Sequence, residues 1–482
     1  MTETPAPQTT PQPAPSVLPP PTGMTLLIGA LLVANIAVNL LHGIGIEAGT
    51  PYMADVLFVV VLVLLAPRVR GSRHVFLTVS TLLAAYCLIM LEHPFAVLQP
   101  ALAQGSFIMA FFCALASLEH VAARSPAINR AAAFIANQPP GRRYLALGFG
   151  TQVFALMLSY GALSLLGTMA RRSAEREPVP AVRALRIRRM LQGAQCGFSA
   201  SLCWSPLAFA TVITSALVPG VQINSVVAHG LGSALIIVLV GWLVDRRLKG
   251  SLPQGTVVAP PDQTAARDTR ALWPLAALLT AVAVPAVVLD VFAGIPPSRT
   301  VLGLVPLIAA CWVLVERGTG ERLRELGRRA RHYAFGDLPG YKAEIVLLST
   351  AGFIGSAAGA LLAQAIAAAG VDLGMVPARL LLVLPLILIP LAGQAGLNPI
   401  LFVSLFAQLL PSPTEMGVAP IAVVLALTSG WALTAPTSPF TASVMIISRL
   451  GGVTPREVAL KWNGTFVVMT ALALGLWVQL MA

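Results

Sequence analysis

The stretches Gly197-Phe198-Ser199-Ala200-Ser201-Leu202-Cys203-Trp204-Ser205-Pro206-Leu207 and Gly430-Trp431-Ala432-Leu433-Thr434-Ala435-Pro436-Thr437-Ser438-Pro439-Phe440 follow one pattern at a constant offset along the chain. At that offset, glycine matches glycine at the first position, and Ser205-Pro206 matches Ser438-Pro439. Each stretch lies within a long apolar run and interrupts it with glycine, proline and hydroxyl residues. Proline ends or kinks a helix because it lacks an N–H donor. The sequence therefore predicts two helices that are broken at corresponding places in two repeats.

The composition is typical of a membrane protein. The chain has 482 residues, of which 57% are hydrophobic and only 10% are charged, and its mean hydropathy is +0.82. A soluble domain of this length could not bury so much apolar surface, so we predict an all-α polytopic membrane protein. The net charge of +12 comes from arginines in short loops between apolar runs. That is the positive-inside pattern, and it argues against a nucleic-acid partner. The five cysteines lie in apolar runs without metal-ligand spacing, so no metal site is predicted.

Apolar runs of spanning length predict eleven transmembrane helices. Assigning the basic loops to the cytoplasm puts the N-terminus inside and the C-terminus outside. Residues 1–22 are rich in proline and are expected to form a disordered tail. The predicted spans are 24–44, 52–67, 75–92, 104–122, 191–218, 225–245, 271–293, 300–316, 343–370, 418–448 and 463–481.

Two further apolar regions do not fit a single crossing. Region 144–170 has arginine-rich loops on both sides, so both of its ends are assigned to the cytoplasm. Region 378–411 has few basic residues on either side, so both of its ends are assigned to the outside. We interpret each region as a re-entrant helical hairpin, one opening inward and one outward. Irregular backbone at membrane depth must be buried in protein or line a wet cavity, and hairpins in a protein interior meet that condition.

These assignments divide the chain into two inverted-topology repeats and their supporting parts. The first repeat, 104–245, contains a span, the hairpin 144–170, the broken span 191–218 and a last span. The second repeat, 343–482, has the same order, with the hairpin 378–411 and the broken span 418–448. The supporting parts are N-terminal scaffold helices at 23–103, a cytoplasmic linker at 246–270, and scaffold helices with an arginine-rich cytoplasmic segment at 271–342.

The predicted hairpin tips are Ser159-Tyr160-Gly161-Ala162 and Gln394-Ala395-Gly396-Leu397-Asn398-Pro399, and each hairpin precedes a broken span. This layout resembles the ion transporter superfamily, and most closely the divalent anion:sodium symporter (DASS) family. That family carries Ser-Asn-Thr at its hairpin tips and Thr-Pro-Pro-Asn-like motifs in its broken spans. The tips of this chain diverge, with only Ser159 and Asn398 in similar places. The resemblance implies a homodimer that moves a small organic anion with sodium by an elevator-like motion.

A broken helix can attract ions of either sign. Its new N-terminus presents free N–H groups and attracts anions, and its new C-terminus presents carbonyl groups that can coordinate a cation such as sodium. Hydroxyl and amide side chains near the breaks and tips would add neutral ligands. The alternative interpretation is that serine and glycine only let membrane helices pack closely here. The predicted binding residues are Ser159, Tyr160, Gly161, Ser201, Ser205, Pro206, Gln394, Gly396, Asn398, Thr434, Thr437, Ser438, Pro439 and Thr441, with sodium expected near Ser159 and Asn398.

Few ionisable residues are expected at membrane depth. All are assigned near a membrane face, and His229 is the best proton-linked candidate among them. Two arginine-rich segments, 124–143 and 317–342, also contain apolar residues, so we interpret them either as interfacial helices or as basic loops. The ionisable candidates are His42, Glu92, Glu119, His120, His229 and Asp290.

The sequence thus predicts a secondary active transporter for a small carboxylate-type anion, coupled to sodium or protons and without another cofactor. Richness in alanine, arginine and proline suggests a bacterium, and hence its inner membrane. Two alternatives stay open: the transmembrane subunit of a binding-protein-dependent tripartite carrier, and an exporter of a neutral or amphipathic solute. An intramembrane enzyme is disfavoured, because the chain contains neither His-Glu-x-x-His nor Gly-x-Ser-x-Gly.

Overall fold

The computed structural model describes residues 23–46, 49–123, 125–139, 142–249, 269–293, 297–316, 322–370 and 373–482. All regular structure in these ranges is helical, and nine helical segments are long and apolar enough to cross a membrane. Shorter apolar helices accompany them. The prediction of an all-α polytopic membrane protein is confirmed. The predicted tail and most of the predicted linker lie outside the described residues.

Four helices open the described chain: α1 (Gly23–Gly43), α2 (Thr50–Leu65), α3 (Ser72–Met90) and α4 (Pro94–Ala122). The sequence placed the start of the fourth span at residue 104, whereas the helix that contains it, α4, already begins at Pro94. Proline suits the first position of a helix, where its missing N–H is not needed. The long α4 packs against α1, α2, α12 and α14, and so joins the two halves of the chain.

The next helices contain the first predicted hairpin and the first predicted break. They are α5 (Pro126–Ala136), α6 (Arg143–Leu158), α7 (Tyr160–Glu175), α8 (Pro180–Trp204), α9 (Phe209–Leu217) and α10 (Ile223–Lys249). Helices α6 and α7 pack together as a hairpin with one residue, Ser159, between them. Helix α8 begins well before the apolar run, because arginine is a good helix former and extends it. The re-entrant topology of this hairpin in a membrane stays a prediction.

The second half begins with α11 (Trp273–Ala293), α12 (Pro297–Glu316) and α13 (Arg322–His332). A π-helical turn, η3 (Tyr333–Asp337), and a short 3-10 turn, η4 (Leu338–Tyr341), connect α13 to α14. Both arginine-rich segments therefore contain a helix, α5 in the first and α13 in the second. The remaining helices are α14 (Lys342–Ala368), α15 (Ala378–Gln394), α16 (Pro399–Leu409), α17 (Pro413–Met416), α18 (Pro420–Thr437), α19 (Ala442–Gly451) and α20 (Gly464–Met481).

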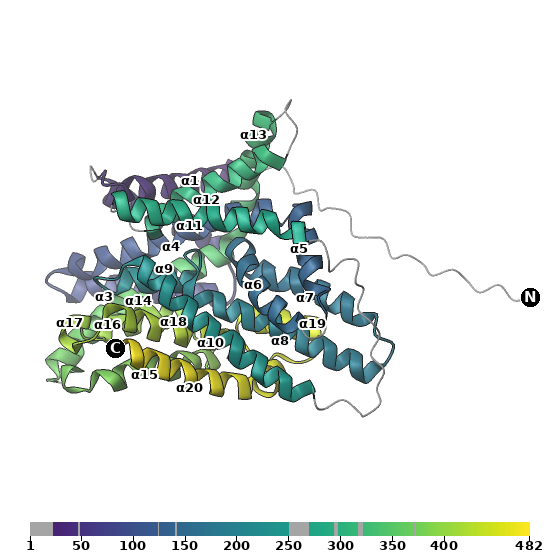
Figure 1. The fold of residues 1–482 in the computed structure, drawn as a ribbon. Coiled ribbons are helices and arrows are strands. Elements are labelled where there is room, and N and C mark those ends of the chain that lie inside the picture. Colours follow the sequence, from purple (N-terminus) through teal and green to yellow (C-terminus); the bar gives the residue numbers. More distant parts are fainter. Residues whose placement is uncertain are drawn as a thin grey trace, which may run out of the picture.

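The broken helices occupy the centre of the bundle. In the apolar 18-residue part of the segment Pro420–Gly451, 89% of the residues are buried inside the protein. The same share is 78% in Pro180–Leu217 and only 6% in Arg73–Met90. In the view of Figure 1, α1, α11 and α12 lie at the top, α15 and α20 lie at the bottom, and α8 and α18 lie between them. The interrupted segments are thus shielded from the surroundings, while helices such as α3 carry the exposed apolar surface.

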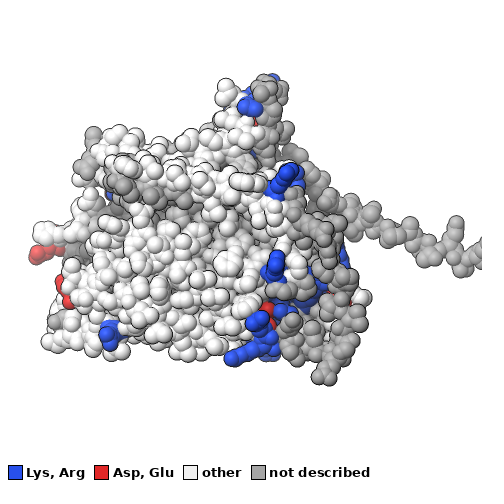
Figure 2. Space-filling model, in the orientation of Figure 1, with Lys and Arg blue, Asp and Glu red and all other residues white. Residues whose placement is uncertain are grey.

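The surface suits a bilayer. Many large apolar side chains are exposed, among them Val63, Ile89, Phe292 and Leu472. The face drawn in Figure 2 is mostly uncharged, and its lysines and arginines gather towards the right-hand end. Lipid tails would cover such an apolar face, and basic residues gathered at one end fit the positive-inside pattern.

Each broken helix packs closely on the first arm of its hairpin. A Cβ atom added at Gly197 of α8 would lie 2.2 Å from the carbonyl oxygen of Gly148 in α6. A Cβ atom added at Gly430 of α18 would lie 2.3 Å from the carbonyl oxygen of Pro385 in α15. No other residue fits where two backbones approach this closely. The first glycine of each repeated motif therefore serves the same contact in both halves.

The two broken helices cross antiparallel to each other. The Ser199 hydroxyl donates a 2.5 Å hydrogen bond to the Ala432 carbonyl oxygen, and Cys203 Sγ lies 4.0 Å from the Thr428 carbonyl oxygen. Moving forward along α8 thus means moving backward along α18. Ser199 and Ala432 hold the same place in the two repeated motifs, so the crossing point relates equivalent positions.

Candidate functional site

Both apolar segments break at the repeated Ser-Pro pair. Helix α8 ends at Trp204 and α9 begins at Phe209, while α18 ends at Thr437 and α19 begins at Ala442. In the first break, the Ser205 hydroxyl accepts a 3.2 Å hydrogen bond from the Leu207 backbone N–H. In the second, Ser438 accepts an identical 3.2 Å bond from the Phe440 N–H. The two serines are buried and shape the turns at the breaks, which is a structural role.

The carbonyl end of α18 is paired with protein donors. Its last four carbonyl oxygens lack partners within the helix. The Ser438 N–H donates to the Thr434 carbonyl oxygen at 3.0 Å. The Ser443 hydroxyl donates to the Ala435 carbonyl oxygen at 2.5 Å. The other bonds run from Thr441 Oγ1 to the Ala435 oxygen (3.1 Å), from Asn463 Nδ2 to the Pro436 oxygen (3.0 Å) and from Gln394 Nε2 to the Thr437 oxygen (2.6 Å).

The first break follows the same logic. Pro206 cannot donate to the Leu202 carbonyl oxygen four residues earlier. Instead the Thr211 hydroxyl of α9 donates to that oxygen at 3.1 Å. In both repeats, then, a hydroxyl of the second half-helix replaces the hydrogen bond that proline removes. These carbonyl groups already have partners, which leaves them less suited to coordinating a cation.

The amide ends of the half-helices are different. The N-cap residues of α9 and α19, Ala208 and Thr441, make no capping hydrogen bond with their side chains, and neither does Ser159 at the start of α7. By contrast, α16 is capped by Asn398, whose side-chain oxygen accepts a 2.8 Å bond from Ile400 N–H. Uncapped N-terminal N–H groups carry partial positive charge and attract anions.

The tip of the first hairpin is strained and exposed. Ser159 has φ 44° and ψ −122°, and it is the sole non-glycine residue with positive φ in the described ranges. Such backbone strain is concentrated at functional sites in proteins. The next residue, Tyr160, is 45% exposed, and its ring lies 4.9 Å from the Phe198 ring of α8. This tip therefore presents a hydroxyl and an aromatic face beside the first broken helix.

A carboxyl group adjoins the same tip. A Cβ atom at Gly161 would lie 3.3 Å from Oε1 of Glu119, in the last turn of α4. The sequence assigned Glu119 to the cytoplasmic end of its span, with no relation to the hairpin. Only the fold brings α4 and the tip together, so no local sequence signal could have placed this carboxyl group at the candidate site.

The second tip is fastened to the second break. The Gln394 amide bonds to the Thr437 oxygen, and the Ser438 hydroxyl donates to the Gly393 oxygen at 2.6 Å. Gly396, with φ 84°, would place a Cβ 3.6 Å from Phe440. The structure thus brings together Gln394, Thr437 and Ser438 as one cluster.

The remaining predicted residues have local roles. Ser201 and Thr434 donate to carbonyl oxygens of their own helices, Phe198 at 2.7 Å and Gly430 at 2.9 Å. Pro206 and Pro439 follow the capping serines and end their helices. His229, the proton-linked candidate, has Nδ1 2.8 Å from the Ser225 carbonyl oxygen of its own helix. The side chain of Asp290 lies outside the described residues.

Sequence reasoning missed a set of buried amides at the crossing. Asn463, before α20, donates both to Gln195 Oε1 at 2.9 Å and to the Pro436 oxygen at 3.0 Å. Trp204 Nε1 donates to Gln152 Oε1 of α6 at 2.8 Å. A signal was available, because Gln192, Gln195 and Ser199 recur at helical spacing inside an apolar run.

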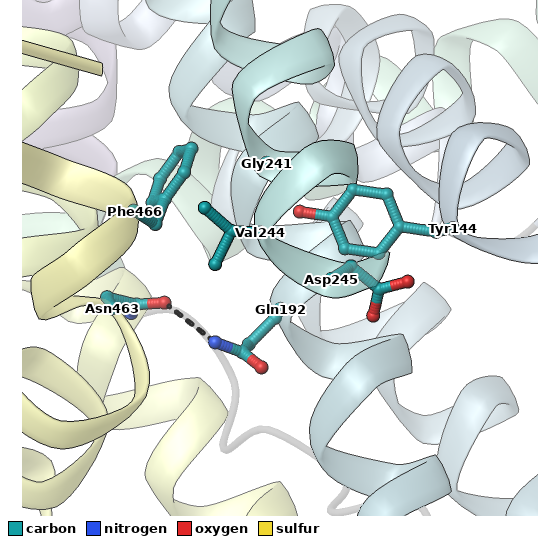
Figure 3. Close-up of a pocket in the computed structure, with 7 residues that line it drawn as sticks. All are labelled: Tyr144, Gln192, Gly241, Val244, Asp245, Asn463 and Phe466. Atoms are coloured by element: carbon teal, nitrogen blue, oxygen red, sulfur yellow. Dashed lines mark hydrogen bonds between the residues drawn. The ribbon is translucent and has the colours of Figure 1, made fainter. Parts of the chain in front are cut away.

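A small polar pocket adjoins these amides (Figure 3). Gln192 Nε2 donates to the Trp462 carbonyl oxygen at 2.7 Å and lies 3.5 Å from Asn463 Oδ1. The buried Asp245 carboxylate accepts two bonds from Arg189, of 2.7 and 2.6 Å. The pair neutralises its charges locally. The pocket is lined by Tyr144, Gln192, Gly241, Val244, Asp245, Asn463 and Phe466.

One intramembrane acid was also missed. Asp55 of α2 is 9% exposed, and its Oδ1 has no hydrogen-bond partner among the described residues. Its position near the start of an apolar run could have flagged it, since an acid inside a span is costly and often functional.

The chain matches no protein-family model and no curated protein. Its fold is similar to those of solved transporters, two of which follow. One is the YdaH transporter of Alcanivorax borkumensis, at 15% identity over 85% of this chain and 99% of that chain, with a TM-score of 0.50. The other is MtrF of Neisseria gonorrhoeae, described with a class of antimetabolite efflux pumps, at 15% identity over 86% and 96%, with a TM-score of 0.51. The shared fold is that of an all-helical membrane protein, and neither match is to the DASS family.

Proposed function

We propose that this chain is a secondary active transporter that moves a small organic anion across the bacterial inner membrane. The observation that carries the proposal is the antiparallel crossing of α8 and α18, joined at the equivalent residues Ser199 and Ala432. Each crossing helix breaks at a Ser-Pro pair beside its own hairpin. Discontinuous helices near the centre of a repeat pair form the binding sites of many transporters.

The pairing of backbone groups favours an anion at the breaks. The carbonyl oxygens at the end of α18 are bonded to protein donors, while the N-termini of α7, α9 and α19 lack side-chain caps. The exposed Ser159 and Tyr160 would add a hydroxyl and a phenol. A carboxylate-type substrate would thus meet donors without needing an arginine.

The coupling and the motion are extensions of this proposal. An elevator-like shift, as the DASS resemblance implies, would move the hairpins and broken helices against α1–α3 and the start of the second half. Sodium is one candidate coupling ion. The other candidate is a proton carried by Glu119 beside Gly161, because carboxyl groups within transmembrane segments commonly act as proton relays in transporters. A homodimer is expected by the same resemblance.

A second candidate function is export of an amphipathic solute. The Tyr160–Phe198 ring pair and the 59% exposed Phe440 give the tips an aromatic character that suits a partly apolar solute. The fold similarity to MtrF, described with efflux pumps, points the same way.

The test is transport into proteoliposomes. Labelled succinate, citrate and monocarboxylates would be supplied with and without inward sodium or proton gradients. We expect gradient-driven uptake of at least one acid, and its loss in Tyr160→Ala. The matched control is Tyr86→Ala, a 51% exposed tyrosine of α3, far along the chain from both tips. Movement of labelled acid only out of preloaded vesicles would favour export. No movement of any acid in either direction would refute the anion proposal.

A further inference from the structure

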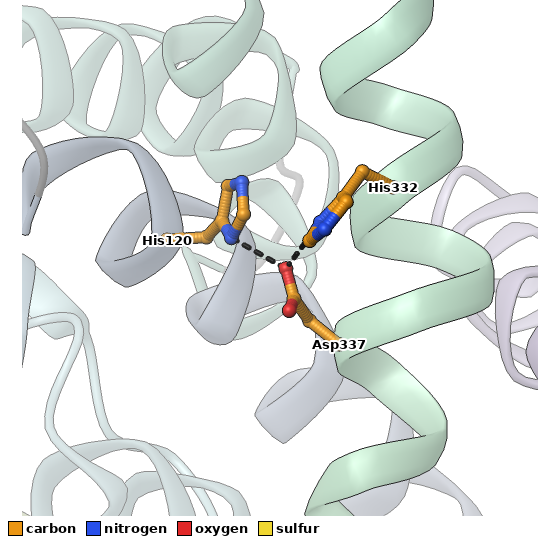
Figure 4. A group of neighbouring side chains, drawn as sticks. All are labelled: His120, His332 and Asp337. Carbon is orange, nitrogen blue, oxygen red and sulfur yellow. Dashed lines mark hydrogen bonds and ion pairs between the residues drawn. The ribbon is translucent and has the colours of Figure 1, made fainter. Parts of the chain in front are cut away.

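Three side chains of types that can bind a metal ion meet beside the last turn of α4 (Figure 4). His120 lies in the last turn of α4, His332 ends α13, and Asp337 ends the π-helical turn η3. Asp337 Oδ2 lies 2.6 Å from His120 Nδ1 and 3.2 Å from His332 Nδ1. One ligand atom from each residue falls within 4.8 Å of the others. Two imidazole rings thus contact the same carboxylate oxygen.

We infer that His120, His332 and Asp337 form a binding site for a divalent transition-metal ion of the zinc type. Imidazole nitrogen and carboxylate oxygen are ligands that Zn²⁺ prefers, at about 2.0–2.2 Å. Three such ligands in a tetrahedral site lie roughly 3.3 Å from one another, as follows from those distances. The 3.2 Å separation between His332 Nδ1 and Asp337 Oδ2 is close to that value. The 2.6 Å separation between His120 Nδ1 and the same oxygen would have to grow by less than 1 Å.

The burial of the three side chains fits an accessible metal site. His120 is 6% exposed and Asp337 is 18% exposed, whereas His332 is 45% exposed. The partly exposed His332 provides a path from solvent, and the fourth coordination position would be open to water. The three side chains therefore resemble a metal site with three protein ligands and one open position, rather than a structural site with four protein ligands.

Neighbouring contacts hold the ligands in place without a metal. The Tyr333 hydroxyl donates to the Cys113 carbonyl oxygen of α4, and the Tyr333 ring lies 5.8 Å from the His120 ring. These contacts fix η3 on α4, so the site is prearranged. Two arginines of α13, Arg328 and Arg329, pair with Glu325.

A metal ion at this point would connect α4 with the segment that leads into α14. It would fasten the arginine-rich helix α13 to the long helix on which both halves pack. This inference does not depend on the transport proposal, because metal binding is measured on the purified chain whether or not it transports.

The experiment is titration of the detergent-solubilised full chain, stripped of metal, with Zn²⁺ by calorimetry and with Co²⁺ by visible absorption. We expect one equivalent of tight binding, a tetrahedral Co²⁺ spectrum, and a rise in unfolding temperature that a chelator reverses. His332→Ala and Asp337→Asn should each weaken binding by at least about 10-fold.

The control variant is His74→Ala, which removes an exposed histidine of α3. It should bind like the wild type, and the metal-free unfolding temperature of each variant reports whether it is folded. His332 is partly exposed, so His332→Ala is expected to fold normally. Absence of metal binding by the wild type would overturn the inference. So would binding by His332→Ala and Asp337→Asn that is as tight as binding by the wild type.

Discussion

The Ser199 hydroxyl donates to the carbonyl oxygen of Ala432, its counterpart in the other broken helix, over 2.5 Å. The bond has a specific cause. The carbonyl of Ala432 would ordinarily accept from the N–H four residues later, but that residue is Pro436. One broken helix thus supplies the donor that proline removes from the other, and it does so at the point where the two helices cross.

Replacement of Ser199 by alanine tests that link. Ser199→Ala leaves the buried Ala432 oxygen without its donor, so the free energy of unfolding should fall by about 1–2 kcal/mol. Unfolding in mixed micelles would measure it. Ser201→Ala is the control, because that hydroxyl bonds only within its own helix at 2.7 Å and its loss should matter less. Equal effects of the two changes would contradict the special role of the crossing bond.

The two motif glycines provide a second test. Gly197→Ala and Gly430→Ala each place a methyl group 2.2–2.3 Å from a carbonyl oxygen, which the backbones cannot accommodate without moving apart. We expect the free energy of unfolding of both variants to fall by about 1–3 kcal/mol or more, because the added methyl group overpacks the contact. Both variants should also express poorly. Gly464→Ala, at a position with nothing within 4 Å, should be neutral. Stable, well-expressed variants at Gly197 and Gly430 would show that the helices are not so closely packed.

Ser159 separates backbone strain from chemistry at the first tip. Its φ of 44° favours glycine, so Ser159→Gly should fold at least as stably as the wild type, while Ser159→Val should lose about 1–3 kcal/mol. Thermal unfolding measures both. Because we predict that the hydroxyl binds substrate, Ser159→Gly should also transport less. Full transport by this variant would remove the hydroxyl from the site and leave only its geometry.

The breaks were foreseeable from the sequence, because proline and a repeated motif act locally. Ser205-Pro206 and Ser438-Pro439 contain the chemistry that ends a helix, and the structure ends α8 and α18 there. The hairpin over 144–170 was predicted from charge in the flanking loops, and its tip at Ser159 from the DASS resemblance. The start of α4 was missed, because Pro94 can begin a helix as readily as it can interrupt an apolar run.

The partners of the broken ends could not be predicted in the same way. Asn463 bonds Pro436 and Gln195, and Glu119 adjoins Gly161, only because distant helices pack together. The pairing of His120 with Asp337 likewise spans the two halves of the chain. Such contacts depend on tertiary packing, which hydrophobic periodicity does not specify.

The membrane topology of the first hairpin is open to chemical labelling. Cys311 is the one exposed cysteine among five, so Cys311→Ser gives a background of buried thiols. In it, Arg142→Cys and Arg172→Cys place exposed thiols at the two ends of the α6–α7 hairpin. If the hairpin is re-entrant, an impermeant maleimide should label both from the cytoplasmic side only. Labelling of the two positions from opposite sides would mean that the segment crosses the membrane.

The second hairpin tip allows a test of how the tip and the break act together. Gln394 donates to the Thr437 oxygen and Ser438 donates to the Gly393 oxygen, both over 2.6 Å, so two bonds tie the same pair of segments. Gln394→Ala removes one of them at a half-buried position. We expect a roughly tenfold fall in transport, the equivalent of about 1.4 kcal/mol, with folding nearly intact.

The double-mutant cycle decides whether those two bonds form one unit. Ser438→Ala alone also loses the turn bond to Phe440 N–H, so it should be the more damaging single change. If the bonds act together, the combined variant should lose less than the product of the two single effects, because the first change already frees the tip. Transport and unfolding temperature would be measured for all four proteins. Strictly independent effects would indicate that the tip is held by packing, and that Gln394 has a different role, such as contacting the substrate directly.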